Sequence, residues 1–369
     1  MQEELMFAVQ NDFPTCDDEW VAIKPYHLVL QLVSRISARV FVGLPLCRSP
    51  KWLETSTQFT ENVFVSVVFL RLFPTWLHGI LSLLLPSTWR GSAYIRSAKK
   101  LLVPEIWRRR ALWQYTQEGN PDKVDLVTEN LLSWMMQSAE GQENDAAHLA
   151  HLEIVISLAS IHTSQMNVVH VLYDLATYPD YVEPLREEIR NTADADGGWH
   201  KSSYTKLRKL DSFIKESQRR NPPSMLSYHR VMSQDYTLND GTKLARGTHI
   251  AMAVSAIQND PDVTSSPEVF DGFRYYRLRQ QPGEGHLHQF ATTESNMLNF
   301  GHGKNACPGR FFASLEIKTI LVKLIMDYDF KFLDGMGRPA NLKAHEFIFP
   351  NPEGQMVVRK RDVKETFQF

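Results

Sequence analysis

Cysteine is scarce in this chain: Cys16, Cys47 and Cys307 are the only ones among 369 residues. They lie too far apart to form a Cys-x-x-Cys motif, so the sequence excludes a four-cysteine zinc site and a disulfide framework. So few thiols are typical of a protein in a reducing compartment. Any cysteine chemistry in this chain is therefore the chemistry of a single thiol.

An excess of charge of one sign is also lacking. Lys and Arg number 40 against 42 Asp and Glu, which gives a formal net charge of -2. Such a balance provides no general attraction to a polyanion, and we expect no nucleic acid among the partners. The chain has no Gly-x-Ser-x-Gly motif, Walker loop or dinucleotide fingerprint, so hydrolase triads and bound nucleotide cofactors have no support. Electrons for any redox reaction would have to come from a separate protein.

An apolar run long enough to span a bilayer is missing as well. The longest apolar region, residues 63–86, contains Arg71, Pro74 and His78. A central Arg costs a membrane span roughly 2.5 to 3.5 kcal/mol. The first residues, Met-Gln-Glu-Glu-Leu, show neither the basic start nor the apolar core of a signal peptide. We therefore expect no membrane-spanning segment in this sequence.

Apolar side chains, by contrast, are plentiful. Hydrophobic residues make up 43% of the chain and charged residues 22%, which is typical of a globular protein with a large core. No Pro/Gly/Ser-rich linker divides the chain, so we expect one domain over residues 1–369. Apolar periodicity predicts helices at 26–41, 52–73, 92–117, 122–138, 145–178, 184–191, 204–220 and 310–327. Extended segments at 236–238 and 248–254 flank a turn and predict a small sheet. The predicted fold class is mainly α with a small β-sheet region.

The strongest chemical signal is the segment FGHGKNACPGR at residues 300–310, just before the last predicted helix. A thiolate at Cys307 would be stabilised by the positive end of that helix and by backbone N–H donors. A thiolate ligand pushes electron density onto iron and favours O–O cleavage, so the loop indicates oxygenase chemistry. The alternative is that Cys307 is a buried apolar thiol in an ordinary Gly-rich turn, the commoner fate of a lone cysteine.

The pattern Phe-x-x-Gly-x-x-x-Cys-x-Gly, matched at Phe300, Gly303, Cys307 and Gly309, resembles the haem-binding signature of the cytochrome P450 family. The resemblance implies haem b, iron protoporphyrin IX, with Cys307 as the axial iron ligand and the other three residues at the cofactor. Asn305 departs from the pattern, because the family usually has a basic residue there that helps to hold a haem propionate. This departure affects the expected haem affinity, and Cys307 remains the expected axial ligand.

A second resemblance involves Glu216, Arg219 and Arg274. The i, i+3 spacing places Glu216 and Arg219 on one helix face, where the plain interpretation is a surface ion pair worth under about 1 kcal/mol. The pair also resembles the family's Glu-x-x-Arg motif, which joins an Arg from a later segment, here Arg274. The resemblance implies a buried triad with a structural role. Gly272 stands where the family usually has Pro.

A third resemblance lies in residues 159–164, ASIHTS, within a long predicted helix. This segment is similar to the family's oxygen-binding segment, with Thr163 as the matching residue that supports oxygen activation. A hydroxyl there can also bond to the carbonyl one turn back, and by default such a Thr only packs in the helix. His162 stands where an acid is usual.

Two weaker matches follow Pro222-Pro223. The resemblance implies that residues 224–227 form a substrate-facing turn and that Arg230 meets a haem propionate, although either can be ordinary loop chemistry. The histidines of His286-Leu287-His288 lack a ligand partner at a sensible spacing, and we interpret them as solvated.

The resemblance covers about residues 18–349 and is closest to filamentous-fungal members that oxidise terpenoids and other secondary metabolites. It implies a haem-thiolate monooxygenase that inserts one atom of O2 into an apolar small molecule. Its electrons would come from NADPH through a separate NADPH-cytochrome reductase. One alternative is a truncated relative with weak haem binding and no monooxygenase activity. Another is a haem isomerase or dehydratase.

Family members extend further at the N-terminus, with a membrane anchor, the first strands and a haem-contacting helix. We therefore expect this chain to be an N-terminally incomplete catalytic domain that holds haem substoichiometrically. The resemblance implies the cytoplasmic face of the endoplasmic reticulum membrane. Without an anchor the chain would be cytoplasmic or peripheral.

Overall fold

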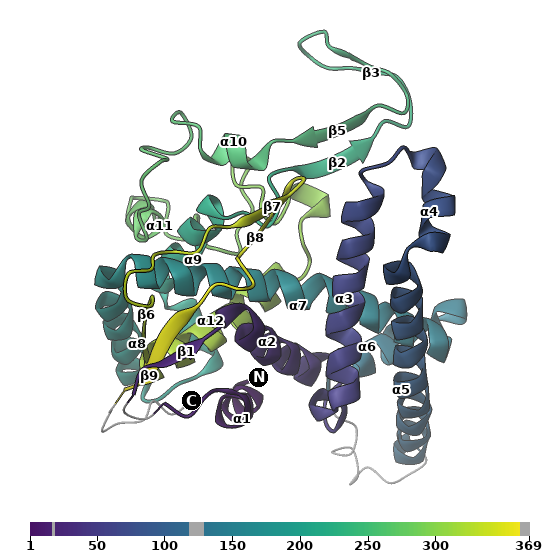
Figure 1. Cartoon of the computed structure of the whole chain (residues 1–369), viewed down its shortest axis with the longest axis horizontal. Coiled ribbons are helices and arrows are strands. Elements are labelled where there is room, and N and C mark those ends of the chain that lie inside the picture. The colour runs from purple at the N-terminus through teal and green to yellow at the C-terminus, as the bar shows by residue number, and fades with distance from the viewer. Residues whose placement is uncertain (17–18, 118–128, 362–369) are drawn as a thin grey trace. The chain divides into compact units, whose positions relative to one another are not determined.

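The computed structural model describes residues 1–16, 19–117 and 129–361 (Figure 1). The chain divides into two compact units. The first consists of Met1–Pro14 and His27–Gln165, and the second of Thr15–Tyr26 and Met166–Phe369. The longest helices are α5, Pro86–Gln117, and α7, Ala146–Thr177, and α7 contributes residues to both units. The single catalytic domain over residues 1–369 stays a prediction.

The described part of the first unit is helical. Besides α5 and the first part of α7 it contains α1 Gln2–Asp12, α2 Pro25–Phe41, α3 Pro50–Leu70, α4 His78–Leu84 and α6 Leu131–Ser138. Helix α3 begins where the Ser49 hydroxyl accepts a hydrogen bond from the Trp52 N–H, with Pro50 in the first turn. Trp52 and Phe59 are buried on one face of α3, as the seven-residue spacing requires. Helix α3 packs against α5 (Figure 1).

The second unit combines helices with small antiparallel sheets. Its helices are α8 Val182–Asp196, α9 Arg208–Arg220, α10 Val254–Gln258, α11 Arg274–Leu278 and α12 Arg310–Asp327. A three-stranded sheet has the order β1-β9-β6, formed by Val21–Ile23, Met356–Lys360 and Tyr328–Lys331. Three strand pairs complete the set: β2 Ser227–Val231 with β5 His249–Met252, β3 Tyr236–Thr237 with β4 Lys243–Leu244, and β7 Leu342–Ala344 with β8 Phe347–Phe349.

This architecture confirms the predicted fold class, mainly α with a small β-sheet region. Helix α12 begins and ends where the sequence predicts. Helices α1 and α4 were not predicted, and helix 204–220 is instead a 3-10 turn at Lys201–Thr205 followed by α9. Of the helix predicted at 122–138, the structure has Leu131–Ser138 as α6, and residues 122–128 lie outside the described residues.

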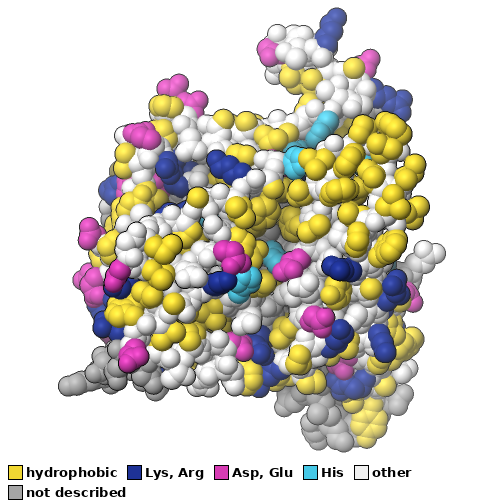
Figure 2. Space-filling model, viewed as in Figure 1, with side chains coloured by type: hydrophobic (Ala, Val, Ile, Leu, Met, Phe, Trp, Pro, Cys, Tyr) yellow, Lys and Arg dark blue, Asp and Glu magenta, His cyan; other side chains and the backbone are white. Residues whose placement is uncertain are grey.

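The end of α3, helix α4 and the start of α5 carry an exposed apolar surface. Its most exposed side chains are Leu72, Trp76, Ile80, Leu83, Leu84 and Trp89, and we call them the α4 surface. Figure 2 shows hydrophobic side chains gathered over this part of the first unit. No helix in the described ranges is long and apolar enough to cross a membrane.

Candidate functional site

The cysteine loop, residues 300–309, is closed by a backbone hydrogen bond. The N–H of Cys307 donates to the carbonyl of Phe300 at 2.7 Å, and a short 3-10 turn, Gly303–Asn305, lies between them. Gly301 and Gly303 have φ of 69° and 64°, in the left-handed region that favours glycine. A Cβ at Gly301 would also lie 3.3 Å from the carbonyl oxygen of Asn305. The two glycines therefore allow the chain to turn tightly in front of the cysteine.

Cys307 lies at the N-terminal end of α12. Arg310 opens the helix, and its Nη1 donates to the Cys307 carbonyl at 2.8 Å. Gly309 packs beside the thiol, because a Cβ there would lie 4.0 Å from Sγ. The thiol is half-buried beside the N-terminal end of the helix, where the backbone carries a partial positive charge. This position suits a sulfur that binds a metal ion from one side.

The other two cysteines occupy different surroundings. Cys16 and Cys47 are both buried. Burial is the largest influence on Cys47 and raises the pKa of its thiol to about 11. A thiol with such a pKa is protonated at neutral pH and is a poor metal ligand. Among the three cysteines, the geometry therefore favours Cys307 as the ligand, an assignment that stays a prediction.

Two nitrogen atoms beside the cysteine loop test whether haem fits these residues. His302 Nδ1 and Arg310 Nε are buried and have no hydrogen-bond partner within the described residues. Buried polar groups without partners are costly, and a bound ligand with acceptor oxygens removes that cost. Haem carries two propionate carboxylates, which are acceptors of this kind. The donor set, a thiol with two unpartnered nitrogens around a Gly-rich loop, therefore fits haem.

The three residues of the predicted triad lie together in the second unit. Arg219 Nε and Nη2 donate to the two carboxylate oxygens of Glu216 at 2.8 and 2.7 Å, and Arg274 Nε approaches the same carboxylate at 3.3 Å. Glu216 and Arg219 are fully buried. A bidentate pair with a second guanidinium satisfies the carboxylate away from water. Arg274 in turn donates to the carbonyls of Ser266 and Val269, so the cluster fastens helix α9 to the segment before α11.

The structure explains why Gly272 stands where the family usually has Pro. A Cβ at Gly272 would lie 2.5 Å from the Phe213 ring and 2.9 Å from the Tyr181 ring. The Gly272 N–H also donates to the Tyr181 hydroxyl at 3.2 Å, and a proline has no such hydrogen. The aromatic side chains packed on this turn therefore require glycine.

Thr163 belongs to the first unit, in helix α7. Its hydroxyl donates to the carbonyl of Ala159 at 2.8 Å, the bond one turn back that the sequence allows. The buried hydroxyls of Ser160 and Ser164 have no hydrogen-bond partner within the described residues. The helix thus places three hydroxyls within five residues.

His162 is buried next to this group. Its Nε2 lies 3.4 Å from the carbonyl of Thr57 in α3, and burial lowers the pKa of the imidazole to about 4. The ring is therefore neutral at pH 7. It cannot replace the acid usual at this position as a charged group, although a neutral imidazole still carries one N–H.

The two weaker matches lie in the second unit. Arg230, in β2, donates through Nη1 to the His229 carbonyl at 2.7 Å, and its guanidinium lies 4.5 Å from the centre of the Tyr228 ring. Ser224 caps its own turn by donating to the Leu226 carbonyl at 2.7 Å. A haem contact by Arg230 and a substrate contact by residues 224–227 stay predictions.

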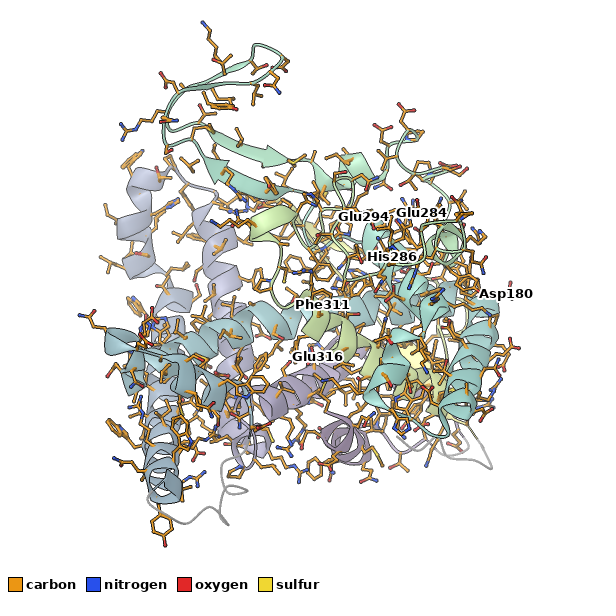
Figure 3. The ribbon with its side chains drawn as sticks, turned by 180° about the vertical axis from the view of Figure 1, so that it is seen from behind. Asp180, Glu284, His286, Glu294, Phe311 and Glu316 are labelled. Carbon is orange, nitrogen blue, oxygen red and sulfur yellow. The ribbon has the colours of Figure 1, made fainter. Side chains whose placement is uncertain are left out.

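The interpretation of His288 as solvated is wrong. His288 lies between Glu284 at 2.8 Å and Glu294 at 3.1 Å, and Glu294 also accepts from buried Lys215 at 2.7 Å. Figure 3 shows Glu284 and Glu294 near His286 in the loop before the cysteine segment. Glu294 lies 79 residues after Lys215, so the spacing of these residues in the sequence does not predict their contact. Its ion pairs hold the loop against helix α9.

The chain is similar to known proteins over nearly its whole length. The family model described as cytochrome P450 matches residues 10–358. Cytochrome P450 monooxygenase AN1598 of Emericella nidulans is 48% identical over 363 residues, and cytochrome P450 monooxygenase olcJ of Penicillium canescens is 46% identical over 361 residues. An ent-kaurene oxidase of Gibberella intermedia is 39% identical over 370 residues. The matches cover 98%, 98% and 99% of this chain and 67% of each relative.

Proposed function

This chain belongs to the cytochrome P450 family, and from that premise we propose a haem-thiolate monooxygenase that inserts one atom of O2 into an apolar small molecule. Membership confirms the predicted enzyme class, an oxidoreductase, and implies haem and O2. The residue roles, the substrate class and the redox partner below belong to the proposal. The observation that carries it is the position of the Cys307 thiol, half-buried between a closed Gly-rich loop and the N-terminal end of α12.

Each residue around the cysteine has a part in the proposed site. Cys307 would ligate the haem iron as a thiolate, and Phe300, Gly303 and Gly309 would shape the loop that holds the cofactor. Bound haem supplies the oxygen-activating chemistry, which thiolate ligation favours. His302, Arg310 and Arg230 are the candidates to bind the propionates. In the part of the chain that the structure describes, no group bonds to the buried His302 Nδ1 or Arg310 Nε.

Thr163 is the proposed proton-handling residue. Its hydroxyl donates to the Ala159 carbonyl in the structure and can turn toward another acceptor by rotation about χ1. Ser160 and Ser164 lie on the same helix, and no described residue bonds to their hydroxyls. Together they give α7 the groups to hold and pass a proton without a carboxylate at position 162.

The names of two relatives support a proposed substrate class. Two of them are named ent-kaurene oxidases, at 39% and 38% identity. A terpenoid or another fungal secondary metabolite is therefore the proposed substrate. A pocket for such a molecule selects by burial of apolar surface with few polar anchors.

The proposed electron donor is an NADPH-cytochrome reductase. This chain has no dinucleotide fingerprint in its sequence, so a nicotinamide cofactor has no recognisable site here. NADPH then acts on the reductase, and the reductase transfers electrons to this chain.

The proposed location is the cytoplasmic surface of the endoplasmic reticulum, and the α4 surface supports it. Trp76, Leu83 and Leu84 are 75%, 68% and 69% exposed, an unusual concentration of large apolar side chains. No Asp or Glu occurs between Glu61 and Glu105, whereas five basic residues do: Arg71, Arg90, Arg96, Lys99 and Lys100. Apolar and basic side chains together suit an anionic lipid surface.

Absorbance spectroscopy tests the function directly. Reduced protein with carbon monoxide should show the red-shifted Soret band of thiolate ligation, and a reconstituted system with reductase and NADPH should oxidise ent-kaurene or a related hydrocarbon. The alternative function, a relative with weak haem binding and no turnover, predicts little Soret absorbance per chain. A band at the position typical of histidine ligation would contradict the proposal.

The membrane location has a separate test. Vesicles with anionic lipid should co-sediment with the protein, and Trp76→Ser with Leu83→Ser should reduce the bound fraction. Val269→Ser, which changes an exposed apolar residue in the second unit, is the matched control and should leave sedimentation unchanged. Equal sedimentation of all variants would contradict the lipid assignment.

A further inference from the structure

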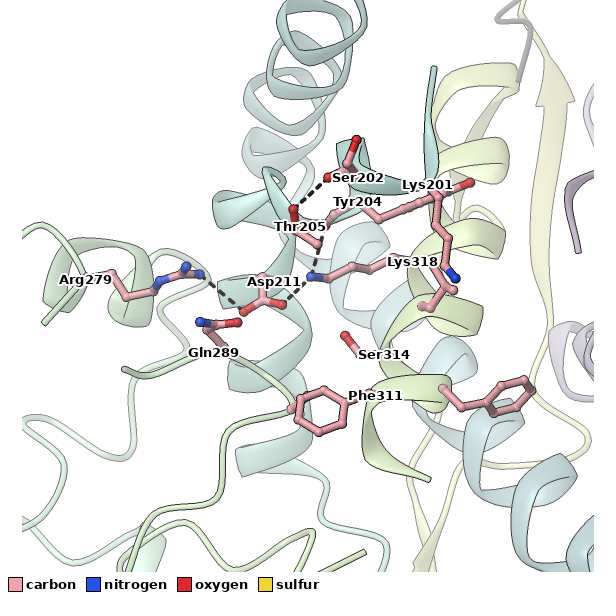
Figure 4. A pocket seen from close by; sticks show the side chains of 13 residues that line it. Lys201, Ser202, Tyr204, Thr205, Asp211, Arg279, Gln289, Phe311, Ser314 and Lys318 are labelled. Carbon is pink, nitrogen blue, oxygen red and sulfur yellow. Dashed lines mark hydrogen bonds and ion pairs between the residues drawn. The ribbon is translucent and has the colours of Figure 1, made fainter. Parts of the chain in front are cut away.

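A cavity of about 640 Å³ lies in the second unit (Figure 4). It is formed by the 3-10 turn before α9, by α9 itself, by the loop after α11 and by the first turns of α12. Its polar lining includes Asp211, Arg279, Ser314 and Lys318. Its volume lies in the range of small-molecule sites, roughly 300 to 1,000 Å³.

The cavity holds more buried positive than negative charge. Arg279, Lys318 and Asp211 are 7%, 6% and 4% exposed. Figure 4 shows Asp211 between the two cations. Its carboxylate contacts Lys318 Nζ, and its other oxygen accepts from the N–H of Phe290 at 2.8 Å. The Asp211 carboxylate is thus shared between two cations and a backbone N–H.

Arg279 is the cation that has too few hydrogen-bond acceptors in this arrangement. Its Nη1 lies 3.6 Å from Asp211, too far for a hydrogen bond, and its Nε donates to the Gly285 carbonyl at a long 3.4 Å. The carboxylate of Glu188, which also acts on Arg279, is occupied by the N–H groups of Lys209 and Leu210. Burial lowers the pKa of Arg279, as expected for a guanidinium with too few acceptors. An added anion would supply the missing acceptors.

The opposite side of the cavity is apolar. Phe311 is 63% exposed, and Leu315 and Ala291 line the same space. The Ser314 side chain also lines this space and carries a hydroxyl that can donate a hydrogen bond. An apolar wall facing buried cations matches a molecule with an apolar body and a charged head.

We propose that this cavity binds a small organic anion, a carboxylate or phosphate ester. The anionic head accepts hydrogen bonds from Arg279, Lys318 and Ser314, and an aromatic or aliphatic body packs on Phe311. The cavity goes beyond the proposed monooxygenase site, because Cys307 is not among the residues that line it. Carboxylate and phosphate share the recognition chemistry, and the experiment separates them.

Isothermal titration calorimetry on the full chain tests the site with four probes: phenyl phosphate, benzoate, inorganic phosphate and benzyl alcohol. At least one of the two aromatic anions should bind one molecule per chain. Neutral benzyl alcohol should bind about tenfold more weakly or worse, because a charge-assisted hydrogen bond contributes that much. The stronger of phenyl phosphate and benzoate identifies the head group. Equal binding of benzyl alcohol, or no saturable binding of either anion, overturns the proposal.

Two variants place the binding in this cavity. Arg279→Gln should weaken the bound anion about tenfold or more, whereas Arg277→Gln, two residues away and exposed, should leave its affinity unchanged. Thermal unfolding shows whether Arg279→Gln is folded. If it is not, Phe311→Ala tests the location of the site instead, because the Phe311 side chain is largely exposed and its removal should leave the fold intact. Phe311→Ala should weaken phenyl phosphate or benzoate about threefold or more and leave inorganic phosphate unchanged. Wild-type affinity for the aromatic anions in Phe311→Ala overturns the assignment.

Discussion

Glu153 in helix α7 provides a prediction whose size follows from the structure. Its side chain is 0% exposed, and neither carboxylate oxygen has a hydrogen-bond partner within the described residues. Burial raises the pKa of this carboxyl from 4.5 to about 8, and the charge of Arg109 opposes the shift only in part. At neutral pH the folded protein therefore keeps Glu153 protonated, whereas the unfolded chain ionises it.

The sign and size of the effect follow from proton linkage. Because the folded state binds this proton more tightly, its stability is greatest below pH 4.5 and falls as the pH rises toward 8. One pKa unit corresponds to about 1.4 kcal/mol, so the 2.5 units between 4.5 and pH 7 correspond to a loss of about 3 kcal/mol. Glutamine keeps the shape and cannot ionise. Glu153→Gln should therefore stabilise the protein by about 3 kcal/mol at pH 7.

Urea unfolding at pH 5 and pH 7 measures this difference. Glu153→Gln should gain less than about 1 kcal/mol at pH 5 and about 3 kcal/mol at pH 7. Glu143→Gln, an exposed carboxyl in the 3-10 turn before α7, is the matched control and should change little at either pH. An equal gain at both pH values, or none at pH 7, would refute the reasoning that Glu153 is a buried acid without a partner.

Three further predictions concern the haem site and its support. Cys307→Ala should abolish the red-shifted Soret band of the reduced carbon monoxide complex, and Cys16→Ala and Cys47→Ala should retain it. Thr163→Ala should keep haem and substrate binding while NADPH consumption shifts from product to peroxide, measured as the ratio of the two; an unchanged ratio would leave Thr163 as a packing residue. Glu216→Ala should destabilise the fold by about 3 to 5 kcal/mol in urea unfolding, because it leaves buried guanidinium groups unpaired. A decrease in the free energy of unfolding of less than about 1 kcal/mol would contradict the burial of these guanidinium groups.

The sequence predicted helix α12 and missed helix α4. Helix α12 follows a Gly-rich loop and ends before a strand, and its bounds agree with the prediction. Helix α4, His78–Leu84, consists mostly of Leu, Ile, Gly and Ser and buries none of its side chains. Its seven residues are fewer than the window of about 11 to 18 over which a period of 3.6 residues can be recognised. The apolar periodicity of the sequence therefore does not predict this short helix.

The candidate site shows the same division between local and distant contacts. Glu216 and Arg219 are three residues apart on one helix, so their pairing was readable from spacing. Arg274 lies 58 residues from Glu216, and only the family resemblance pointed to it. Neither spacing nor resemblance indicated that His288 pairs with Glu284 and Glu294, because a loop brings these residues together. Spacing predicts contacts within an element, and the fold decides the rest.

Helix α12 links the two sites of the second unit. Arg310 in its first turn donates to the Cys307 carbonyl, and Phe311 and Ser314 in the same region line the cavity. From Ser314 to Met326 nearly every side chain of the helix is buried, so the helix is held on all sides and its first turn cannot shift alone without disturbing that packing. The turn that fixes the backbone of the cysteine therefore also forms the wall of the anion cavity. A substitution at Ser314 therefore needs both the Soret band and the anion titration. A change in the anion titration alone indicates the loss of a local contact, whereas a change in both measurements indicates that the helix is displaced.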